Sequence, residues 1–346
     1  MAIPAEQLAE IKEYLLASEN PLFFYDADCD GLCSFLLIRR FLDRGEGVVV
    51  KGSPKLEAIY ANKVEECKPD KIFVFDKPII AEEFLEKVHV PVIWLDHHMP
   101  LKLKGVKYFN PRIENIKDAS PVTYWCYKIA KQDLWIAAIG SYADWFIPDF
   151  AEEFSKQYPD ILPEAKAKLQ DPGEVLFSTT LGRLIKIFSF ILKGKTNEIV
   201  KCANYLCQID SPYELLNGTS DKARYILEKA HKIEKEYNKL LATALSEITS
   251  YKLFIFVYTG KYAFSQDLST ELIHRFPNKI MIIAREKDGE LKISLRSRDI
   301  VLPPILEKAL EGLEGYGGGH EYACGANIKK HDLDKFIERI KEKINL

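Results

Sequence analysis

The chain has 346 residues, of which 47% are hydrophobic and 29% charged, and its formal net charge at pH 7 is −3. This length allows two or three domains with buried cores, and the slight acidic excess argues against a generally basic surface for binding nucleic acid. It does not exclude an enzyme whose carboxylates bind cations. No apolar run approaches the roughly 20 residues of a membrane span. The acidic, amphipathic N-terminal stretch is unlike a targeting segment, so we expect a cytoplasmic protein without membrane contacts.

The first motif follows a short apolar strand predicted at 22–25. Asp26, Asp28 and Asp30 alternate along the turn after this strand. Gly31 is expected to let the chain reverse sharply, and the apolar residues beyond it recur with helical spacing. The alternatives are an ordinary acidic turn or a calcium loop. An EF-hand loop would need a Glu at its twelfth position, where an apolar helix stands instead.

Two further strands end in an aspartate. Strands predicted at 71–75 and 92–95 are followed by Asp76 and Asp96, just as the first strand ends at Asp26. Strands that alternate with helices indicate a parallel sheet, whose carboxyl ends share one edge. Carboxylates gathered there repel one another unless cations hold them. The sequence therefore predicts a cation site at this edge.

Two histidines complete the fourth strand's motif. His97 and His98 follow Asp96 directly, and Pro100 ends the strand. Ligands bind at the carboxyl ends of strands in open α/β sheets, although a buried histidine pair is alone often structural. Asp144, at the end of a helix predicted at 132–143, is a further carboxylate of the cluster or an ordinary helix-terminal residue.

The remaining elements complete a predicted α/β fold in three parts. A parallel-sheet domain occupies 1–150, a helical extension and connecting helix 151–250, and a smaller α/β domain 251–346. The other strands predicted along the chain are at 47–50, 108–110, 253–258, 279–284 and 290–297. The other predicted helices are at 57–67, 80–87, 121–130, 174–193, 197–207, 221–248, 265–276, 303–312 and 332–343.

A glycine run near the C-terminus predicts a loop. Consecutive glycines leave backbone N–H groups free to bind an anion, although a flexible loop is their commoner meaning. His320 follows the run, and Arg296 and Arg298 precede it in sequence, so a phosphate site is expected here. The glycines concerned are Gly317, Gly318 and Gly319.

These motifs resemble a known superfamily. DADCDG (26–31), the aspartate after KIFVF (71–75), LDHH (95–98) and GSYADW (140–145) resemble, in order, the four motifs of the DHH phosphoesterases. GGGHEYACGA (317–326) resembles the glycine-rich motif of the DHHA1 domain. Among subfamilies, the chain is similar to RecJ-like members, particularly the archaeal RecJ-like single-strand exonucleases and the oligoribonuclease-like branch.

The resemblance implies a site for two Mn²⁺ ions, with Mg²⁺ as the alternative. The implied metal ligands are Asp26, Asp28, Asp30, Asp76, His97 and Asp144. His98 would contact a ligand or the phosphate, and Asp96 would orient a histidine. His320 and Arg296 would contact the substrate phosphate, with Arg298 and the glycines of 317–319 beside it. Some branches of the superfamily have a histidine ligand where this chain has Phe24. We expect that Asp26 supplies the ligand in its place, or that one of the two metal ions binds more weakly.

The implied activity is exonucleolytic hydrolysis of single-stranded DNA or RNA, 3′ to 5′, by two-metal activation of water, as in DNA repair. Partners would be the strand itself and a replication or repair protein such as a helicase, and a homo-oligomer is an open alternative. Other readings are a phosphodiesterase for short oligonucleotides or cyclic dinucleotides, and an inactive Cdc45-like replication scaffold. The aromatic residues Tyr142, Trp145 and Tyr316 would stack on a base or fill the core.

Overall fold

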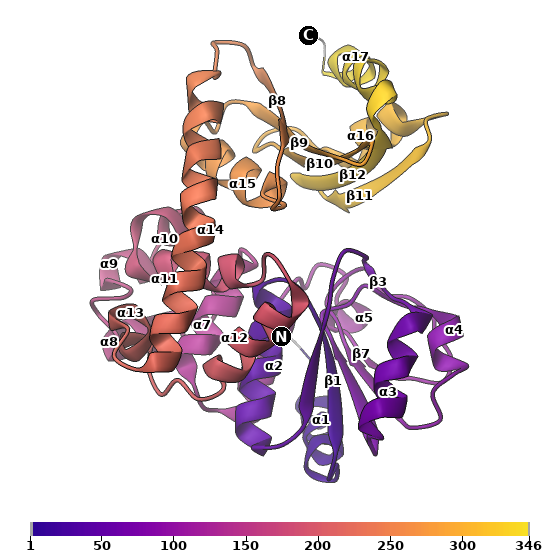
Figure 1. Ribbon diagram of the computed structural model, residues 1–346, viewed down its shortest axis with the longest axis vertical. Coiled ribbons are helices and arrows are strands. Elements are labelled where there is room, and N and C mark those ends of the chain that lie inside the picture. Colours follow the sequence, from indigo (N-terminus) through magenta and orange to yellow (C-terminus); the bar gives the residue numbers. More distant parts are fainter. Residues whose placement is uncertain (1–2, 345–346) are drawn as a thin grey trace. The chain divides into compact units, whose positions relative to one another are not determined.

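The computed structural model describes residues 3–344, and the chain divides into two compact units between Lys232 and Ile233. The first unit is built on a five-stranded sheet, all of whose strands are parallel (Figure 1). The order across this sheet is β2 (Glu46–Val50), β1 (Pro21–Asp26), β4 (Lys71–Phe75), β6 (Val92–Leu95) and β7 (Lys107–Phe109).

Alternate residues of β1 face two helical layers. Tyr25 stacks on Phe35 of α2 (Cys29–Leu42), with 4.8 Å between ring centroids. Phe24 packs edge-on against Phe84 of α4 (Glu82–Leu85), at 5.6 Å. Successive side chains of a strand point to opposite faces, so these contacts mark the two faces of the sheet. α1 (Ala5–Leu16), α6 (Val122–Ala130) and α7 (Leu134–Ala143) lie on the side of α2, and α3 (Ala61–Cys67) on the side of α4 (Figure 1).

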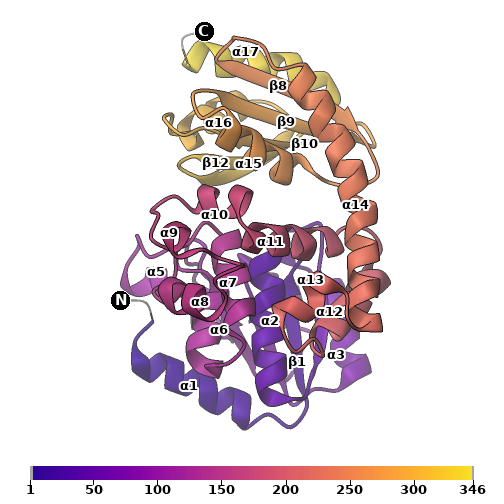
Figure 2. The same ribbon diagram turned by 90° about the vertical axis from the view of Figure 1, so that its left-hand side faces the viewer.

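A helical region follows α7 and packs on it, mainly through α11 (Thr180–Ile191) and also through α8 (Ala151–Gln157) and α10 (Pro172–Ser178) (Figure 2). Arg40 joins this region to the sheet domain, because it forms a bidentate pair with Asp133 before α7 and donates to the carbonyls of Cys207 and Ile209 after α12. The helices are α8 (Ala151–Gln157), α9 (Glu164–Ala167), α10 (Pro172–Ser178), α11 (Thr180–Ile191), α12 (Thr196–Leu206), α13 (Pro212–Asn217) and α14 (Asp221–Ser246). Within residues 3–344, no helix has the length and apolar character needed to span a membrane.

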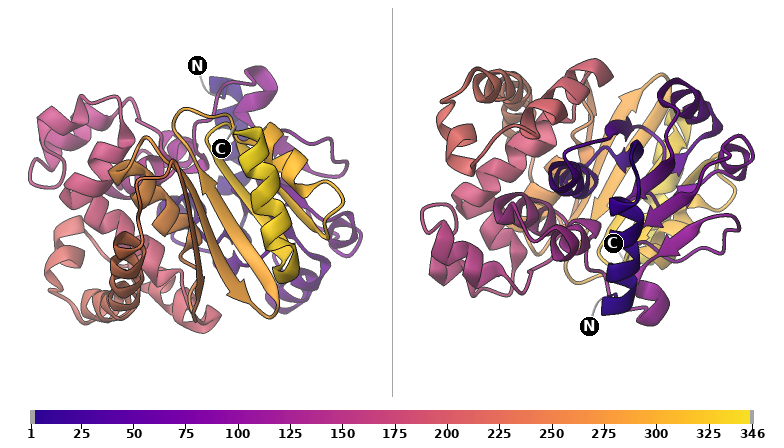
Figure 3. Two further views of the ribbon diagram at one scale, coloured as in Figure 1. Left: turned by 90° about the horizontal axis from the view of Figure 1, so that it is seen from above. Right: turned by 90° about the horizontal axis from the view of Figure 1, so that it is seen from below.

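The second unit contains a mixed sheet between helical layers (Figure 3). Its order is β11 (Gly315–His320), β12 (Ala323–Lys329), β10 (Glu290–Arg296), β9 (Ile280–Lys287) and β8 (Leu253–Thr259). Only β8 and β9 are parallel within this sheet. α16 (Pro303–Leu310) and α17 (Leu333–Lys343) cover one face through a shared apolar core, and α15 (Ser265–Arg275) packs on β9 and β10. The predicted α/β class, with a helical middle and a smaller α/β domain, is confirmed.

Several predicted elements are wrong in detail. The helix predicted at 80–87 shrinks to α4, because Ile79–Ile80 (β5) pairs instead with Lys55–Leu56 (β3). The same pairing shortens the helix predicted at 57–67 to α3, which follows a 3₁₀ turn at Ala58–Tyr60. The helix predicted at 174–193 is two helices, since Thr179 is extended and caps α11 through the N–H of Gly182.

The predicted glycine loop is wrong. Gly315–His320 forms β11, an edge strand that pairs antiparallel with β12. Three of its glycines are required there. A Cβ on Gly315 would lie 2.5 Å from the carbonyl oxygen of Asn327, one on Gly317 would lie 2.7 Å from that of Gly325, and one on Gly319 would clash with that of Ala323. Close approach of two backbones, rather than loop flexibility, accounts for these glycines.

Candidate metal centre

The aspartates that follow the strands meet at one edge of the first sheet. Asp26 is the last residue of β1, and Asp76 and Asp96 come directly after β4 and β6. These three strands are adjacent and parallel. The predicted gathering of carboxylates at the carboxyl edge is therefore a feature of the fold.

The first motif builds the start of α2 against the end of β1. Asp28 caps the helix by accepting from the N–H of Gly31 at 2.9 Å. Asp30 is buried and accepts from the N–H groups of Val122 and Thr123, at 2.9 and 2.7 Å, where α6 begins. Gly31 lies inside α2, and a Cβ there would be 2.5 Å from the carbonyl oxygen of Asp26. The predicted sharp reversal at Gly31 is wrong, because the glycine permits a close contact within a helix.

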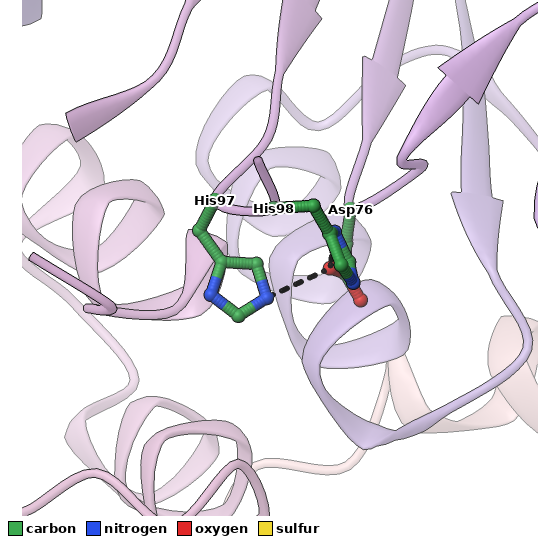
Figure 4. A group of neighbouring side chains, drawn as sticks. All are labelled: Asp76, His97 and His98. Carbon is green, nitrogen blue, oxygen red and sulfur yellow. Dashed lines mark ion pairs between the residues drawn. The ribbon is translucent and has the colours of Figure 1, made fainter. Parts of the chain in front are cut away.

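Asp76 and His97 lie at the centre of the cluster (Figure 4). Asp76 is buried, and its Oδ1 has no hydrogen-bond partner although it lies 3.3 Å from Nε2 of His97. The other ring nitrogen of His97, Nδ1, is 3.6 Å from Oδ2 of Asp144. Arg112 fixes the backbone here by donating its Nε–H to the carbonyl of His97 at 2.7 Å.

Asp96 orients His98 through a hydrogen bond. Nδ1 of His98 lies 2.7 Å from Oδ1 of the fully buried Asp96, which also accepts from the side chains of Tyr108 and Asn110, both at 3.3 Å. Burial alone would lower the pKa of His98, but the hydrogen bond and charge of Asp96 outweigh it, and the pKa is raised. Because an ionised carboxylate only accepts, Nδ1 carries the proton and Nε2 is directed elsewhere.

Lys77 was missed by sequence reasoning. Its side chain is completely buried, and its ammonium group donates to Oδ1 of Asp26 at 2.9 Å and to the carbonyl of Ser53 at 2.7 Å. A lysine is almost never fully buried without a partner, and its position directly after Asp76 was the available signal. Lys77 supplies one positive charge within the acidic cluster.

The carboxylates of the cluster are hard to ionise without a cation. The pKa of Asp26 is raised to about 6, by burial and then by the charge of Asp28, although Lys77 opposes the shift. Burial raises the pKa of Asp144 to about 7, against the opposing effect of His97. Burial and the neighbouring carboxylates raise the pKa of Asp76 far above its ordinary value. One ammonium group therefore does not compensate these charges.

The geometry fits divalent metal ions. Three groups of side chains each bring their ligand atoms within 4.8 Å of one another: Asp26, Asp28 and Asp76; Asp76, His97 and His98; Asp30, His97 and Asp144. Oxygen ligands with one or two imidazoles suit Mn²⁺ or Mg²⁺. The buried Oδ1 of Asp76, which has no hydrogen-bond partner, is an independent sign that these residues can hold a cation. All six predicted metal ligands thus lie in these groups, together with His98.

Phe24 does not face the cluster. It is fully buried on the face of the sheet that α4 covers, against Tyr60 and Phe84. Tyr142, for which stacking on a base and filling the core were both expected, is 1% exposed and therefore fills the core. Trp145 and Tyr316 are 40% and 62% exposed.

In the second unit, the sheet register aligns His320 with Arg296. Both are paired with Ala323, on either side of β12. Directly paired residues of neighbouring strands have side chains on the same face of a sheet. The guanidinium of Arg296 donates to the carbonyl of Leu295 at 2.9 Å, and burial lowers its pKa to about 10. His320 and Arg298 are exposed.

Comparisons with known proteins agree with this geometry. The DHH family, N-terminal domain, matches residues 22–144, and the DHHA1 domain matches residues 254–346. No curated protein matches the chain. Among solved structures, RecJ in complex with Mn²⁺ from Thermus thermophilus has a TM-score of 0.68 at 17% identity, and the alignment covers 97% of this chain and 54% of that one.

Two other solved structures extend the comparison. An exonuclease RecJ bound to manganese has a TM-score of 0.60 at 16% identity, with 99% of this chain and 95% of that one covered. CDC45 from Entamoeba histolytica has a TM-score of 0.51 at 12% identity, with 99% of each chain covered. At such identities the likeness concerns the fold. Together the two family matches span more than half of the sequence. They contain the residues Asp26, Asp28, Asp30, Asp76, His97, Asp144, Arg296 and His320, and the chain therefore belongs to the DHH family and carries a DHHA1 domain.

Proposed function

We propose that the chain is a metal-dependent phosphodiesterase that removes nucleotides from single-stranded DNA or RNA in the 3′ to 5′ direction. The observation that carries the proposal is the cluster of carboxylates and imidazoles around the buried Asp76, whose Oδ1 has no hydrogen bond. Mn²⁺ is the proposed metal, with Mg²⁺ as the alternative. An inactive scaffold would have no physical reason to keep these repelling carboxylates buried together.

Asp76 and His97 each belong to two of the three ligand groups, so these two residues would contribute most to holding the metal ions. When bound, two such ions lower the pKa of water and stabilise the attacking and leaving oxygens of an in-line displacement at phosphorus. Asp26 and Asp28 of the first motif are grouped with Asp76, whereas Asp30 of the same motif is grouped with His97 and Asp144. The proposed ligands are Asp26, Asp28, Asp30, Asp76, His97 and Asp144.

Other residues of the first unit would position groups rather than bind metal. Asp96 holds His98 through Nδ1, which leaves Nε2 for a ligand role or for a phosphate oxygen. Lys77 holds Asp26 in place and offsets part of the negative charge when an anionic substrate approaches. His98 is thus proposed as the residue of this unit that contacts the scissile phosphate.

In the second unit, His320 and Arg296 are the proposed contacts for substrate phosphate. Their alignment across β12 supports this, because two side chains that donate N–H hydrogen bonds on one face of the sheet can contact the same anion. Arg298 and the glycines of β11 are proposed as further contacts. β11 is the edge strand of its sheet, and one side of its backbone has no neighbouring strand among the described residues, which leaves N–H groups for phosphate. The glycines are Gly317, Gly318 and Gly319.

End-labelled single strands of DNA and RNA, blunt duplexes and dinucleotides test the proposal, each with Mn²⁺, Mg²⁺ or EDTA. We expect metal-dependent release of mononucleotides from single strands and little cleavage of duplex. Labels at either end determine the direction. Cleavage of dinucleotides or cyclic dinucleotides alone would identify the short-substrate alternative. Absence of hydrolysis with every metal would favour the Cdc45-like scaffold, and full activity in EDTA would contradict the metal assignment.

A further inference from the structure

The end of α7 holds a tryptophan in an unfavourable backbone conformation. The N–H of Phe146 donates to the carbonyl of Ser141, and that of Trp145 to the carbonyl of Tyr142, at 3.0 and 3.1 Å. This pair of bonds is the Schellman motif, in which the residue after the cap is left-handed and usually glycine. Here that residue is Trp145, with φ of 59°. A bulky side chain in this conformation costs free energy that a glycine would avoid.

Trp145 is much more exposed than a core tryptophan. The other three tryptophans of the chain are at most 1% exposed, whereas Trp145 is 40% exposed. Within residues 3–344, its indole makes no hydrogen bond and no aromatic ring contact. The apolar contact that follows the helix is made by Phe146, whose ring lies 5.1 Å from that of Tyr124. The strain at Trp145 therefore maintains a large, accessible aromatic side chain.

Trp145 is adjacent to the metal centre. Asp144, the preceding residue, has its carboxylate 3.6 Å from the imidazole of His97, and consecutive Cα atoms are about 3.8 Å apart. A phosphodiester bound at the carboxylate and imidazole cluster carries a sugar and base within reach of this position. Indole is a favourable surface for a nucleobase, and stacking tolerates any base.

We infer that Trp145 stacks on the base of the nucleotide whose phosphate binds at the cluster around Asp76. This inference rests on the proposed function and deepens it, since it requires a substrate with a nucleobase next to the scissile bond. An inorganic polyphosphate would gain nothing from the indole. Trp145 is thus a substrate-binding residue that favours nucleotides of any sequence.

The substitution Trp145→Gly separates this role from a structural one. Glycine is the preferred residue at this backbone position, so the midpoint of thermal unfolding should stay the same or rise. KM for single strands should rise about tenfold, corresponding to about 1.4 kcal/mol, with a small change in kcat. Trp145→Phe keeps an aromatic face and should recover most of the loss. Leu101→Ala, which truncates another exposed apolar side chain, is the matched control and should leave KM unchanged.

Abasic substrates identify the stacked group. The substrate is an oligonucleotide whose first and last nucleotides both lack a base. On this substrate the KM of the wild type should be as high as that of Trp145→Gly on a normal strand, and Trp145→Gly should raise it no further. Equal losses for Trp145→Gly on normal and abasic strands would overturn the inference. So would a Trp145→Gly protein with lower stability and unchanged KM.

A binding measurement keeps the inference separate from the proposed function. Iodide quenching of tryptophan fluorescence reports the exposed indole, and the difference between wild type and Trp145→Gly isolates Trp145. A thymidylate oligonucleotide with Ca²⁺ should protect this component from iodide. Absence of protection would overturn the stacking inference even if the enzyme cleaves DNA. Protection without any hydrolysis would support stacking and contradict the proposed activity.

Discussion

Asp76 combines three properties that point to a cation. It is buried, it has a positive φ of 56°, and its Oδ1 accepts no hydrogen bond. Asp76→Asn keeps the shape of the side chain and removes one of the repelling charges. In EDTA at pH 8 the variant should be more stable than the wild type, because burial and neighbouring carboxylates raise the pKa of the Asp76 carboxyl group. Affinity for Mn²⁺, measured by calorimetry, should fall more than about 100-fold. This loss exceeds the one expected when a residue that only hydrogen-bonds to a metal ligand is replaced.

A matched control for this substitution exists in the second unit. Asp288 also has a positive φ, of 53°, but it lies in the exposed turn between β9 and β10. Asp288→Asn should change neither the stability in EDTA nor the affinity for Mn²⁺. Asp76→Asn with wild-type manganese affinity would contradict the assignment of Asp76 as the central ligand.

Lys77 and Asp26 form a pair that should stabilise the metal-free protein. Lys77→Met keeps an unbranched side chain but removes the ammonium group, leaving Asp26 without its cation. Removing one partner of a buried pair costs about 3 kcal/mol, and this loss should be measured by urea unfolding in EDTA at pH 8. At pH 5 the loss should shrink, since the pKa of Asp26 is about 6 with Lys77 present and rises without it. An equal loss at both pH values would show that packing, not charge, is the role of Lys77.

The central residues of the site were predictable because each one follows an apolar run. Asp26, Asp76 and Asp96 stand where hydrophobic strands stop, and that pattern is visible in sequence. Lys77 and Arg112 were missed, because their partners are a distant side chain and a backbone carbonyl rather than sequence neighbours. Long-range partners of this kind are determined by strand order, which a single sequence does not give.

At the scale of elements, the contact between α2 and β1 positions the first motif. Gly31→Ala would place a Cβ 2.5 Å from the carbonyl oxygen and 2.6 Å from the nitrogen of Asp26. The backbones of α2 and β1 are each held by their own hydrogen bonds and cannot move apart freely. The free energy of unfolding should therefore fall by about 1–3 kcal/mol. Because Asp28 and Asp30 move with α2, affinity for Mn²⁺ should fall as well. Urea unfolding and calorimetry measure the two effects.

Gly260→Ala is the control for this substitution. A Cβ on Gly260 would meet the ring of Tyr258 at 3.7 Å, an ordinary contact distance. Its stability should change by less than about 0.5 kcal/mol. A Gly31→Ala protein that is as stable as Gly260→Ala would show that α2 can shift away from β1 without cost.

Elements with a regular apolar pattern were predicted well, and those without one were not. β1, β4 and β6 are apolar on both faces, so their existence and the parallel sheet follow from the sequence. β11 contains four glycines and is exposed along its whole length, so it carries no periodic signal. Its strand conformation comes from pairing with β12, which is a tertiary effect.

At the scale of the molecule, one helix joins the two units. α14 extends from Asp221 to Ser246, and the division between the units falls within it, at Lys232 and Ile233. The sequence placed the start of the last domain at 251, because that is where strand patterns resume. A continuous amphipathic helix gives no compositional sign of which unit each of its turns packs against.

The acidic cluster should reverse the usual pH dependence of stability for the metal-free protein. Asp26 and Asp144 have folded-state pKa values of about 6 and about 7, against 3.8 for an ordinary aspartate. Carboxyl groups with raised pKa values bind protons more tightly in the folded state. Their contribution to stability is therefore complete below about pH 4 and is lost as the pH rises through 6 and 7. In EDTA, the free energy of unfolding of the first unit should therefore increase as the pH is lowered from 8 to 5.

Urea unfolding of the full chain at several pH values checks this expectation, with α14 and the second unit present. If the two units unfold in separate transitions, only the transition of the first unit should shift, since the described part of the second unit lacks the cluster. Saturating Mn²⁺ should reverse the trend, because metal binding requires ionised carboxylates and weakens as they protonate. Asp144→Asn should flatten the dependence between pH 6 and 8 in EDTA. A metal-free wild type that loses stability steadily from pH 8 to 5 would show that the carboxylates are already compensated by the chain's own groups, Lys77 first among them.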